Sequence, residues 1–371
     1  MKKTLIALAA LAATGAAMAQ SSVTIYGVVD VGYTSVNNSG TGTDNTGLTS
    51  SNMTTNRLGF RGTEDLGGGL KAKFQVETSL AADAPAASSI GDRGAWVGLE
   101  GGFGEVRLGR EYSMSFWSGF LFSPFGTGGV GNGYGFIMRS NTHGATGQTN
   151  QIWNNNAVTY STPRIAGFQG HAQYAFDEVA AVGNDAGKSV GLRLNYTDGP
   201  LMAEIAYSST DGGAAIPDTD PNTAGVQGTP VLGLNTTAKH KSVVGGVSYN
   251  FGVARVMANF GQEKASVQAT GASIAKVTNF EIGAVAPVGP GRFRVSYNRT
   301  KLDVTALAVD PQVSKFAVGY IYDLSKRTAL YATVASQKNK NGAAFALSGP
   351  ATTAAANGRS TGYNIGISHT F

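Results

Sequence analysis

The stretch VTIYGVVDVGY, residues 23–33, has an apolar or small residue at every odd position and polar residues among the even ones. Since successive side chains of a β-strand point to opposite faces, this period of two predicts a strand with one apolar and one mixed face. Residues 71–80 and 168–176 repeat the pattern with charges, Gln or His on the polar face. Further segments start near Thr55, Arg93, Glu105, Ala157, Ser189, Leu201, Ser242, Ala254, Val277, Arg292, Ser314, Thr328 and Thr361. We therefore expect sixteen strands.

The connections between these segments alternate in length. Seven are short turns, most of them with Gly or Pro, at 65–69, 101–104, 162–167, 198–200, 250–252, 287–291 and 323–326. Eight are longer polar segments, at 37–53, 81–92, 111–156, 177–188, 209–241, 264–276, 303–311 and 337–360. This is the number of connections that sixteen up-and-down strands require, with all short turns at one rim and all long loops at the other.

Composition excludes several other classes of protein. Of 371 residues, 42% are hydrophobic and 14% charged, with 52 Gly and no Cys, and the mean hydropathy is −0.06. The absence of Cys excludes disulfide frameworks, Cys-based zinc sites and thiol chemistry. The ordered alternation of Val, Tyr and Phe argues against disorder, and the low mean hydropathy argues against a helical membrane protein.

Residues 1–19 resemble a secretory signal peptide, and we do not expect them to be part of the fold. Lys2 and Lys3 precede an apolar run from Leu5 to Ala13, and an A-x-A cleavage site ends at Ala19. A membrane anchor is the alternative, but the run is far shorter than the ~20 residues of a spanning helix. Removal of two Lys lowers the formal charge from +5 to +3, and residues 20–371 remain as one domain.

Exported strands of about ten residues, with one short and one long rim, are typical of a transmembrane β-barrel. We therefore predict an all-β fold, a 16-stranded antiparallel barrel in an outer membrane. A soluble sandwich or β-helix is the alternative, but these folds need neither a polar second face on every strand nor loops of alternating length.

Several segments also carry a family resemblance. They are residues 23–30 (VTIYGVVD), 51–66 with RLGFRGTEDL, 98–110 (GLEGGFGEVRLGR), 155–160 (NNAVTY) and the terminal Phe371. Together they resemble the general bacterial porins of the neisserial and β-proteobacterial type. The resemblance implies a homotrimer in the outer membrane of a Gram-negative bacterium, in contact with lipid and lipopolysaccharide, whose Phe371 helps to direct insertion.

In a porin, polar residues face a water-filled lumen and determine which solutes pass. With the apolar set of each strand taken as outward, nine cations point inward: Arg57, Arg61, Lys71, Lys73, Arg107, Arg193, Arg255, Arg294 and Lys315. Five acids do the same: Asp30, Glu77, Glu105, Glu204 and Glu281. Distance from the short turn places Arg57, Arg61, Lys73 and Glu77 near the waist, since a strand tilted at ~45° climbs about 2.3 Å per residue. For each of them, a solvated rim position without influence on conduction is the alternative.

Arg93 is a further lining candidate on which two arguments disagree. Strand alternation groups it with the outward Val97 and Leu99, whereas the resemblance implies an inward Arg next to that of the second strand. A β-bulge would reconcile the two. The family often has an Arg shortly before the NNAVTY segment, where this chain has Trp153.

The long segment 111–156 is too apolar in its first half for a surface loop alone. By resemblance, it is the third external loop, which folds into the barrel and narrows the channel. Its candidate constriction residues are Glu111, Pro124, Phe125, Gly126 and Arg139. After Glu111 the segment contains no acid up to Asn156. An exposed adhesive or subunit-contact patch is the alternative.

These observations favour a channel for passive diffusion of small hydrophilic solutes and ions, with a preference for anions. The four His lack a Ser, Asp or Glu at a diagnostic spacing, so neither an enzyme nor a cofactor or metal site is expected. The basic residues alternate along strands without a clustered footprint, which argues against nucleic-acid binding. A solute-specific channel or a surface adhesin remains the alternative.

Overall fold

The computed structural model describes residues 22–84, 89–133, 152–177, 188–214, 237–305 and 307–371. The expected signal peptide, residues 1–19, and Arg139 lie outside these ranges. Within them, no helix is long and apolar enough to cross a membrane.

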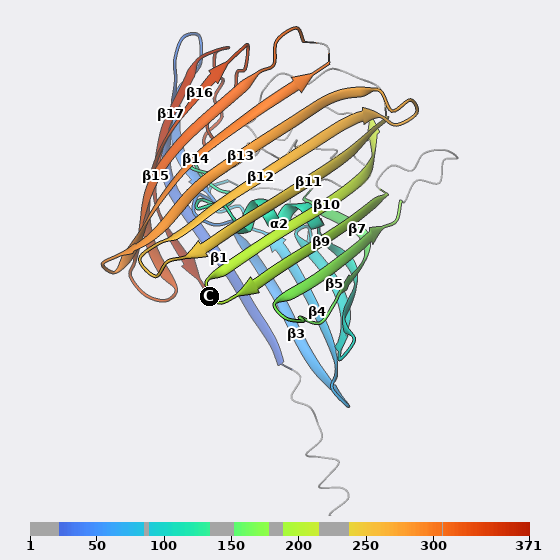
Figure 1. The fold of residues 1–371 in the computed structure, drawn as a ribbon. Helices are drawn as coiled ribbons and strands as arrows, with labels where there is room; N and C mark the ends of the chain where they lie inside the picture. Colours follow the sequence, from blue (N-terminus) through green and yellow to red (C-terminus); the bar gives the residue numbers. More distant parts are fainter. Residues whose placement is uncertain (1–21, 85–88, 134–151, 178–187, 215–236, 306) are drawn as a thin grey trace, which may run out of the picture.

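All the strands belong to one antiparallel sheet. They are β1 (Ser22–Asn38), β2 (Asn45–Ser50), β3 (Arg57–Gly67), β4 (Leu70–Ser79), β5 (Gly94–Gly101), β6 (Gly104–Tyr112), β7 (Trp153–Ser161), β8 (Phe168–Ala175), β9 (Ser189–Asp198), β10 (Leu201–Ala214), β11 (Thr237–Asn250), β12 (Arg255–Val267), β13 (Ser273–Val288), β14 (Gly291–Val304), β15 (Gln312–Asp323), β16 (Thr328–Lys340) and β17 (Arg359–Thr370). β1 pairs with both β2 and β3, each strand from β3 onward pairs with the next along the chain, and β17 pairs with β1, so the sheet closes into a barrel (Figure 1).

Two of these elements share one position in the barrel wall. The second half of β1 pairs with β2 and its first half with β3, so β2 and β3 form a single strand that is interrupted at residues 51–56. The described residues therefore form a closed barrel of sixteen strands, and the predicted fold is confirmed.

The interruption is held by Asp30 of β1. Its carboxylate accepts hydrogen bonds from the backbone N–H groups of Asn52, Met53 and Thr54 at 3.0, 2.9 and 3.1 Å. The hydroxyl of Tyr331 donates a further bond at 2.7 Å. An acid at this inward position thus satisfies backbone donors that the broken strand leaves unpaired, and the side chain is fully buried.

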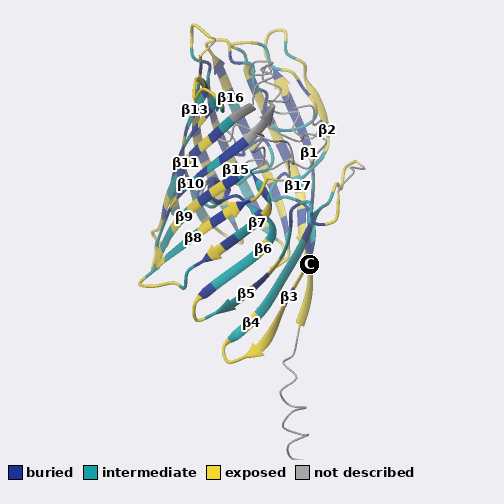
Figure 2. Ribbon diagram, turned by 90° about the vertical axis from the view of Figure 1, so that its right-hand side faces the viewer, coloured by how far each residue is buried: buried dark blue, intermediate teal, exposed yellow. Residues whose placement is uncertain are grey.

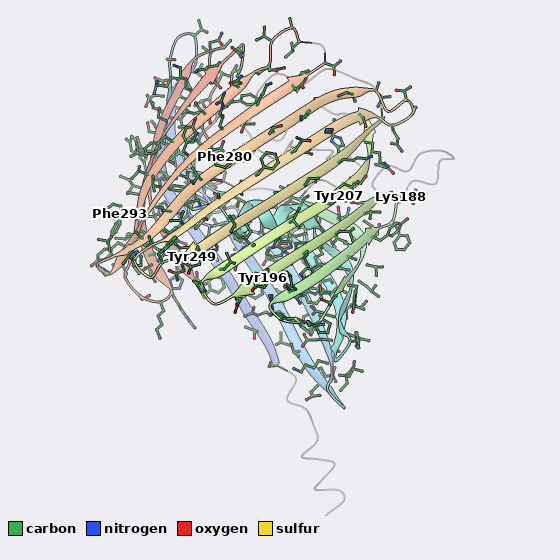
Figure 3. All side chains as sticks on the ribbon, in the orientation of Figure 1. Lys188, Tyr196, Tyr207, Tyr249, Phe280 and Phe293 are labelled. Atoms are coloured by element: carbon green, nitrogen blue, oxygen red, sulfur yellow. The ribbon has the colours of Figure 1, made fainter. Side chains whose placement is uncertain are left out.

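The two faces of the wall have opposite character. Apolar side chains point outward and stay exposed, whereas the inward positions are mostly polar and covered, so exposure alternates along the strands in Figure 2. In Figure 3, Tyr196, Tyr249 and Phe293 lie on the outer face near the short turns, and Phe280 and Tyr207 lie further toward the long loops. Such an apolar band with flanking aromatic residues matches a lipid bilayer and its interfaces.

Two predicted long loops are shorter than expected. β12 and β13 leave only residues 268–272 between them, and the predicted loop 37–53 contains the end of β1 and all of β2. These strand ends are rich in Ser, Thr, Asn, Lys and Gly and lack the apolar alternation of the other segments. Without that alternation, the sequence pattern does not distinguish a strand from a loop.

Candidate functional site in the barrel lumen

The segment after β6 enters the barrel. Its helix α2 (Met114–Leu121) lies inside the wall, behind β9–β11 in the view of Figure 1, and packs against β8 to β12. Met114 and Phe116 are buried, and the ring of Phe116 stacks on Tyr112 with centroids 4.5 Å apart. The expected folded-in third loop is therefore confirmed, because its apolar residues are covered by the inner wall.

The chain after α2 is bound to the opposite wall by polar contacts. Ser123 Oγ donates to Glu281 Oε1 at 3.0 Å, and Lys315 Nζ donates to Asn132 Oδ1 at 2.9 Å. The Arg294 guanidinium lies 4.5 Å from the centre of the Phe125 ring. Glu281, Arg294 and Lys315 point inward as predicted, yet all three are buried beneath the loop. Their charges hold the loop and do not face the water of the lumen.

A first group of charges surrounds Glu77 on β4. The Arg93 Nε is 2.8 Å from Glu77 Oε1, and the Arg57 Nε is 4.0 Å from Glu77 Oε2. The Tyr26 hydroxyl donates to the same carboxylate at 2.9 Å, and Arg93 Nη2 donates to the Tyr112 hydroxyl at 2.6 Å. The Arg61 guanidinium lies 5.1 Å from the Tyr26 ring centre.

Arg93 reaches Glu77 without the bulge considered above. β5 begins one residue later, at Gly94, and its pairing with β4 is regular from Gly94 opposite Glu77. The backbone N–H of Arg93 donates to the Glu77 carbonyl at 3.1 Å. Strand alternation therefore does not apply to Arg93, because it belongs to the turn before the strand.

Arg110 is a member of this group that the strand alternation missed. The pairing of β6 with β7 shifts between Gly109 and Glu111, and Gly109 has a φ of +138°. At this irregularity Arg110 donates to the Asp92 carbonyl at 2.7 Å and to the Asn155 side chain. Trp153, in place of the family's usual Arg, lies 5.5 Å from the Arg110 guanidinium and 5.8 Å from that of Arg93. The glycine in the LGR sequence of β6 is the signal that could have indicated the irregularity.

A second group of charges, closer to the short turns, is densely paired. Lys73 Nζ lies 2.7 Å from carboxylate oxygens of both Glu100 and Glu105. Arg107 pairs with Glu105 at 2.6 Å and also with Glu111. Glu111 was expected in the folded-in loop, but it lies within β6, on the barrel wall.

The same group continues across β8 to β10. Arg193 Nη1 is 3.8 Å from Glu204 Oε2, and Arg193 Nη2 is 3.0 Å from the Nε2 of His171. Aromatic rings cover two of the cations, since Trp96 lies 4.3 Å from the Arg107 guanidinium and Trp117 lies 5.4 Å from that of Arg193.

The two groups differ in charge balance. We call the first the arginine cluster, and it consists of Arg57, Arg61, Arg93, Arg110, Glu77 and Asp92. We call the second the paired belt, and it consists of Lys73, Arg107, Arg193, Glu100, Glu105, Glu111 and Glu204. The arginine cluster contains four guanidinium groups and two carboxylates, and the Asp92 carboxylate accepts the Ser79 N–H at 2.8 Å, whereas the paired belt contains three cations and four carboxylates. Among the described residues, no group of three or more His, Asp and Glu has the arrangement of a metal site.

A closed barrel with an apolar outer band, a polar interior and an inner loop defines a transmembrane channel. Residues 4–342 match the Gram-negative porin family. The chain is 38% identical to outer membrane porin protein 32 of Delftia acidovorans, over 100% of both chains. It is 30% identical to major outer membrane protein P.IB of Neisseria gonorrhoeae, over 89% of this chain and 91% of that one. The solved structure of an anion-selective porin from Comamonas acidovorans has a TM-score of 0.81 and 33% identity, over 95% of this chain and 100% of that one.

The chain therefore belongs to the Gram-negative porin family, whose members are channels of the outer membrane. It is an outer-membrane porin whose water-filled lumen serves the passive diffusion of small hydrophilic solutes.

Proposed function

We propose that this porin prefers anions and that the arginine cluster produces the preference. The supporting observation is the excess of guanidinium groups over carboxylates in the cluster. Charges near a narrow, partly dehydrated passage act at a lower effective dielectric than in bulk water. The loop segment after Glu111 adds no carboxylate up to Asn156, and a structural relative bears the description anion-selective.

The paired belt contributes little to this preference. Its three cations face four carboxylates, so the belt has no excess of positive charge, whereas Arg57 and Arg93 of the arginine cluster share the single carboxylate of Glu77. The predicted excess of nine inward cations over five acids therefore overstates the positive charge that solutes meet. We propose that Arg57 and Arg61 line the constriction. Arg93, which is buried and paired with Glu77, supports them from the wall, and Lys73, Arg107 and Arg193 chiefly stiffen the wall behind it.

Replacement of Arg57 and Arg61 by Gln tests the proposal. In a gradient of dilute salt, the zero-current potential of the double variant should shift toward the cation side. The difference should fade at ~1 M salt, where the screening length is about 3 Å against about 10 Å at 0.1 M. Lys71→Gln is the matched control, because Lys71 is exposed next to the short turn. A cation-selective wild type in dilute salt, or equal potentials for control and double variant, would contradict the proposal.

A solute-specific channel is the second candidate, and the tryptophans favour it. Trp96, Trp117 and Trp153 each lie within 6 Å of an arginine guanidinium, an arrangement that suits planar solutes. Linear conductance that does not saturate with solute supports general diffusion, and block by micromolar solute supports a dedicated binding site. We further propose that the protein is a homotrimer in contact with lipid and lipopolysaccharide, as the family resemblance implies.

A further inference from the structure

The inner wall carries glycines where the folded-in loop touches it. One lies on the lumen face of each of the strands β9, β11, β13, β15 and β17, and they are Gly191, Gly246, Gly283, Gly319 and Gly362. The loop side chains that occupy these positions, in the same order, are Met114, Phe122, Pro124, Phe125 and Val130. The order of the loop residues along the chain thus follows the order of the strands around the barrel.

These contacts leave no room for a side chain on the wall. A Cβ atom at Gly246 would lie 2.2 Å from Phe122 Cδ2, and one at Gly283 would lie 2.4 Å from Pro124 Cγ. At Gly191 the distance to Met114 Cγ would be 2.7 Å. All three distances are well below the 3.5–4.0 Å of favourable carbon contacts, so the loop would have to move. At Gly283 the Val295 carbonyl oxygen of β14 also lies at 2.4 Å, so the wall would have to move as well.

At the remaining two positions the neighbouring strands are closer than the loop. A Cβ atom at Gly319 would lie 2.9 Å from the Ala332 carbonyl oxygen and 3.1 Å from Phe125 Cε1, and one at Gly362 would lie 2.8 Å from the Ser35 carbonyl oxygen and 3.3 Å from Val130 Cγ1. None of the five glycines has a positive φ, so their backbone conformation is open to other residues. Space, and not backbone freedom, is therefore the physical reason for glycine here. At Gly191 and Gly246 the loop alone takes this space, whereas at the other three positions a carbonyl oxygen of a neighbouring strand also excludes a Cβ atom.

The strands between the glycine strands bind the main chain of the loop. Asn259 of β12 donates through Nδ2 to the Phe122 carbonyl at 3.0 Å. From β14, Asn298 donates to the Gly133 carbonyl at 3.4 Å, and Arg294 approaches the Pro124 carbonyl at 3.5 Å. From β11 to β15 the wall thus alternates a notch for a loop side chain with a donor for a loop carbonyl.

We propose that this row of glycines is a seat that determines how far the loop projects into the lumen, and with it the size limit of the channel. The inference goes beyond the proposed anion preference, because it concerns the width of the passage and not its charge. Phe122 is fully buried in its notch, and close-packed contacts transmit a displacement without absorbing it. A side chain added to the seat therefore moves the loop toward the pore axis.

Gly246→Val tests the seat, with Gly245→Val as the matched control. Gly245 precedes it on β11 and points outward, where Val suits the lipid-facing side. In planar bilayers, Gly246→Val should show a lower single-channel conductance and admit only smaller polyethylene glycols than the wild type. The control should behave as the wild type.

Phe122→Ala is the second variant, and it leaves the wall unchanged. It empties the notch, so the loop can approach the wall and both the conductance and the polymer size limit should increase. In the double variant Gly246→Val with Phe122→Ala, the new side chain fills the empty notch, and the conductance should return toward the wild-type value. If Gly246→Val fails to assemble, an unchanged size limit in Phe122→Ala overturns the proposal, as does an unchanged conductance in Gly246→Val.

Discussion

At the scale of the residue, Asp30 shows that an inward charge is not always a lumen charge. Its carboxylate accepts three backbone N–H groups and the Tyr331 hydroxyl, and none of its surface is exposed. In Asp30→Asn, the amide retains one acceptor oxygen and places its NH₂ group against a donor. We expect a loss of about 1–3 kcal/mol in stability, the usual consequence of an unsatisfied buried group.

This loss should lower the temperature at which the folded barrel loses its distinct mobility on unheated gels. Glu64→Gln is the control, since Glu64 lies exposed on β3. Equal transition temperatures for the two variants would show that Asp30 does not hold the interrupted strand.

At the scale of the element, the last residue completes the closing strand pair. The N–H of Phe371 donates to the Gly27 carbonyl at 3.1 Å, and the Gly27 N–H donates to the Phe371 carbonyl at 3.1 Å. Its ring covers Gly27, where a Cβ atom would lie 2.4 Å from Phe371 Cζ. Deletion of Phe371 should leave export to the periplasm intact but reduce assembly in the outer membrane, measured as surface abundance and heat-modifiable protein.

Phe371→Ala separates the two contributions of this residue. It retains the backbone pair and lacks the ring, so assembly as poor as in the deletion would assign the role to the aromatic side chain. Equal surface abundance of wild type and deletion would reject a role of Phe371 in assembly.

At the scale of the whole molecule, exposed apolar side chains of the described strands surround the barrel. The proposed homotrimer rests on the family resemblance. Cross-linking in the outer membrane should give species up to three subunits, and unheated samples should migrate as one large species that heating converts to monomers. Monomers alone, before and after heating, would contradict the trimer.

The period-two alternation determined the number of strands and their inward and outward faces, and the alternating lengths of the connections determined the two unequal rims. These features follow from local geometry, because side chains of any strand alternate and a barrel in lipid must be apolar outside. The folded-in loop followed from family resemblance and from aromatic residues that need cover. The alternation did not predict the orientations of Arg93 and Arg110. Arg93 precedes β5, and Arg110 follows the irregularity at Gly109 in β6, where a shift of one residue reverses the face of every side chain that follows.

Only the tertiary structure decided which inward charges meet water. Strand alternation places the side chains of Asp30, Glu281, Arg294 and Lys315 on the inner face of the wall. They are nevertheless buried under a bend or a loop that comes from elsewhere in the chain. The alternation along a strand predicts the face to which a side chain points, but not which other segment covers it. The same holds for Gly246. In the sequence it is only a residue with a low preference for strands, but in the barrel it contacts the ring of Phe122, which is more than a hundred residues away in the chain. Contacts of this kind depend on closure of the whole sheet, so no local pattern in the sequence contains them.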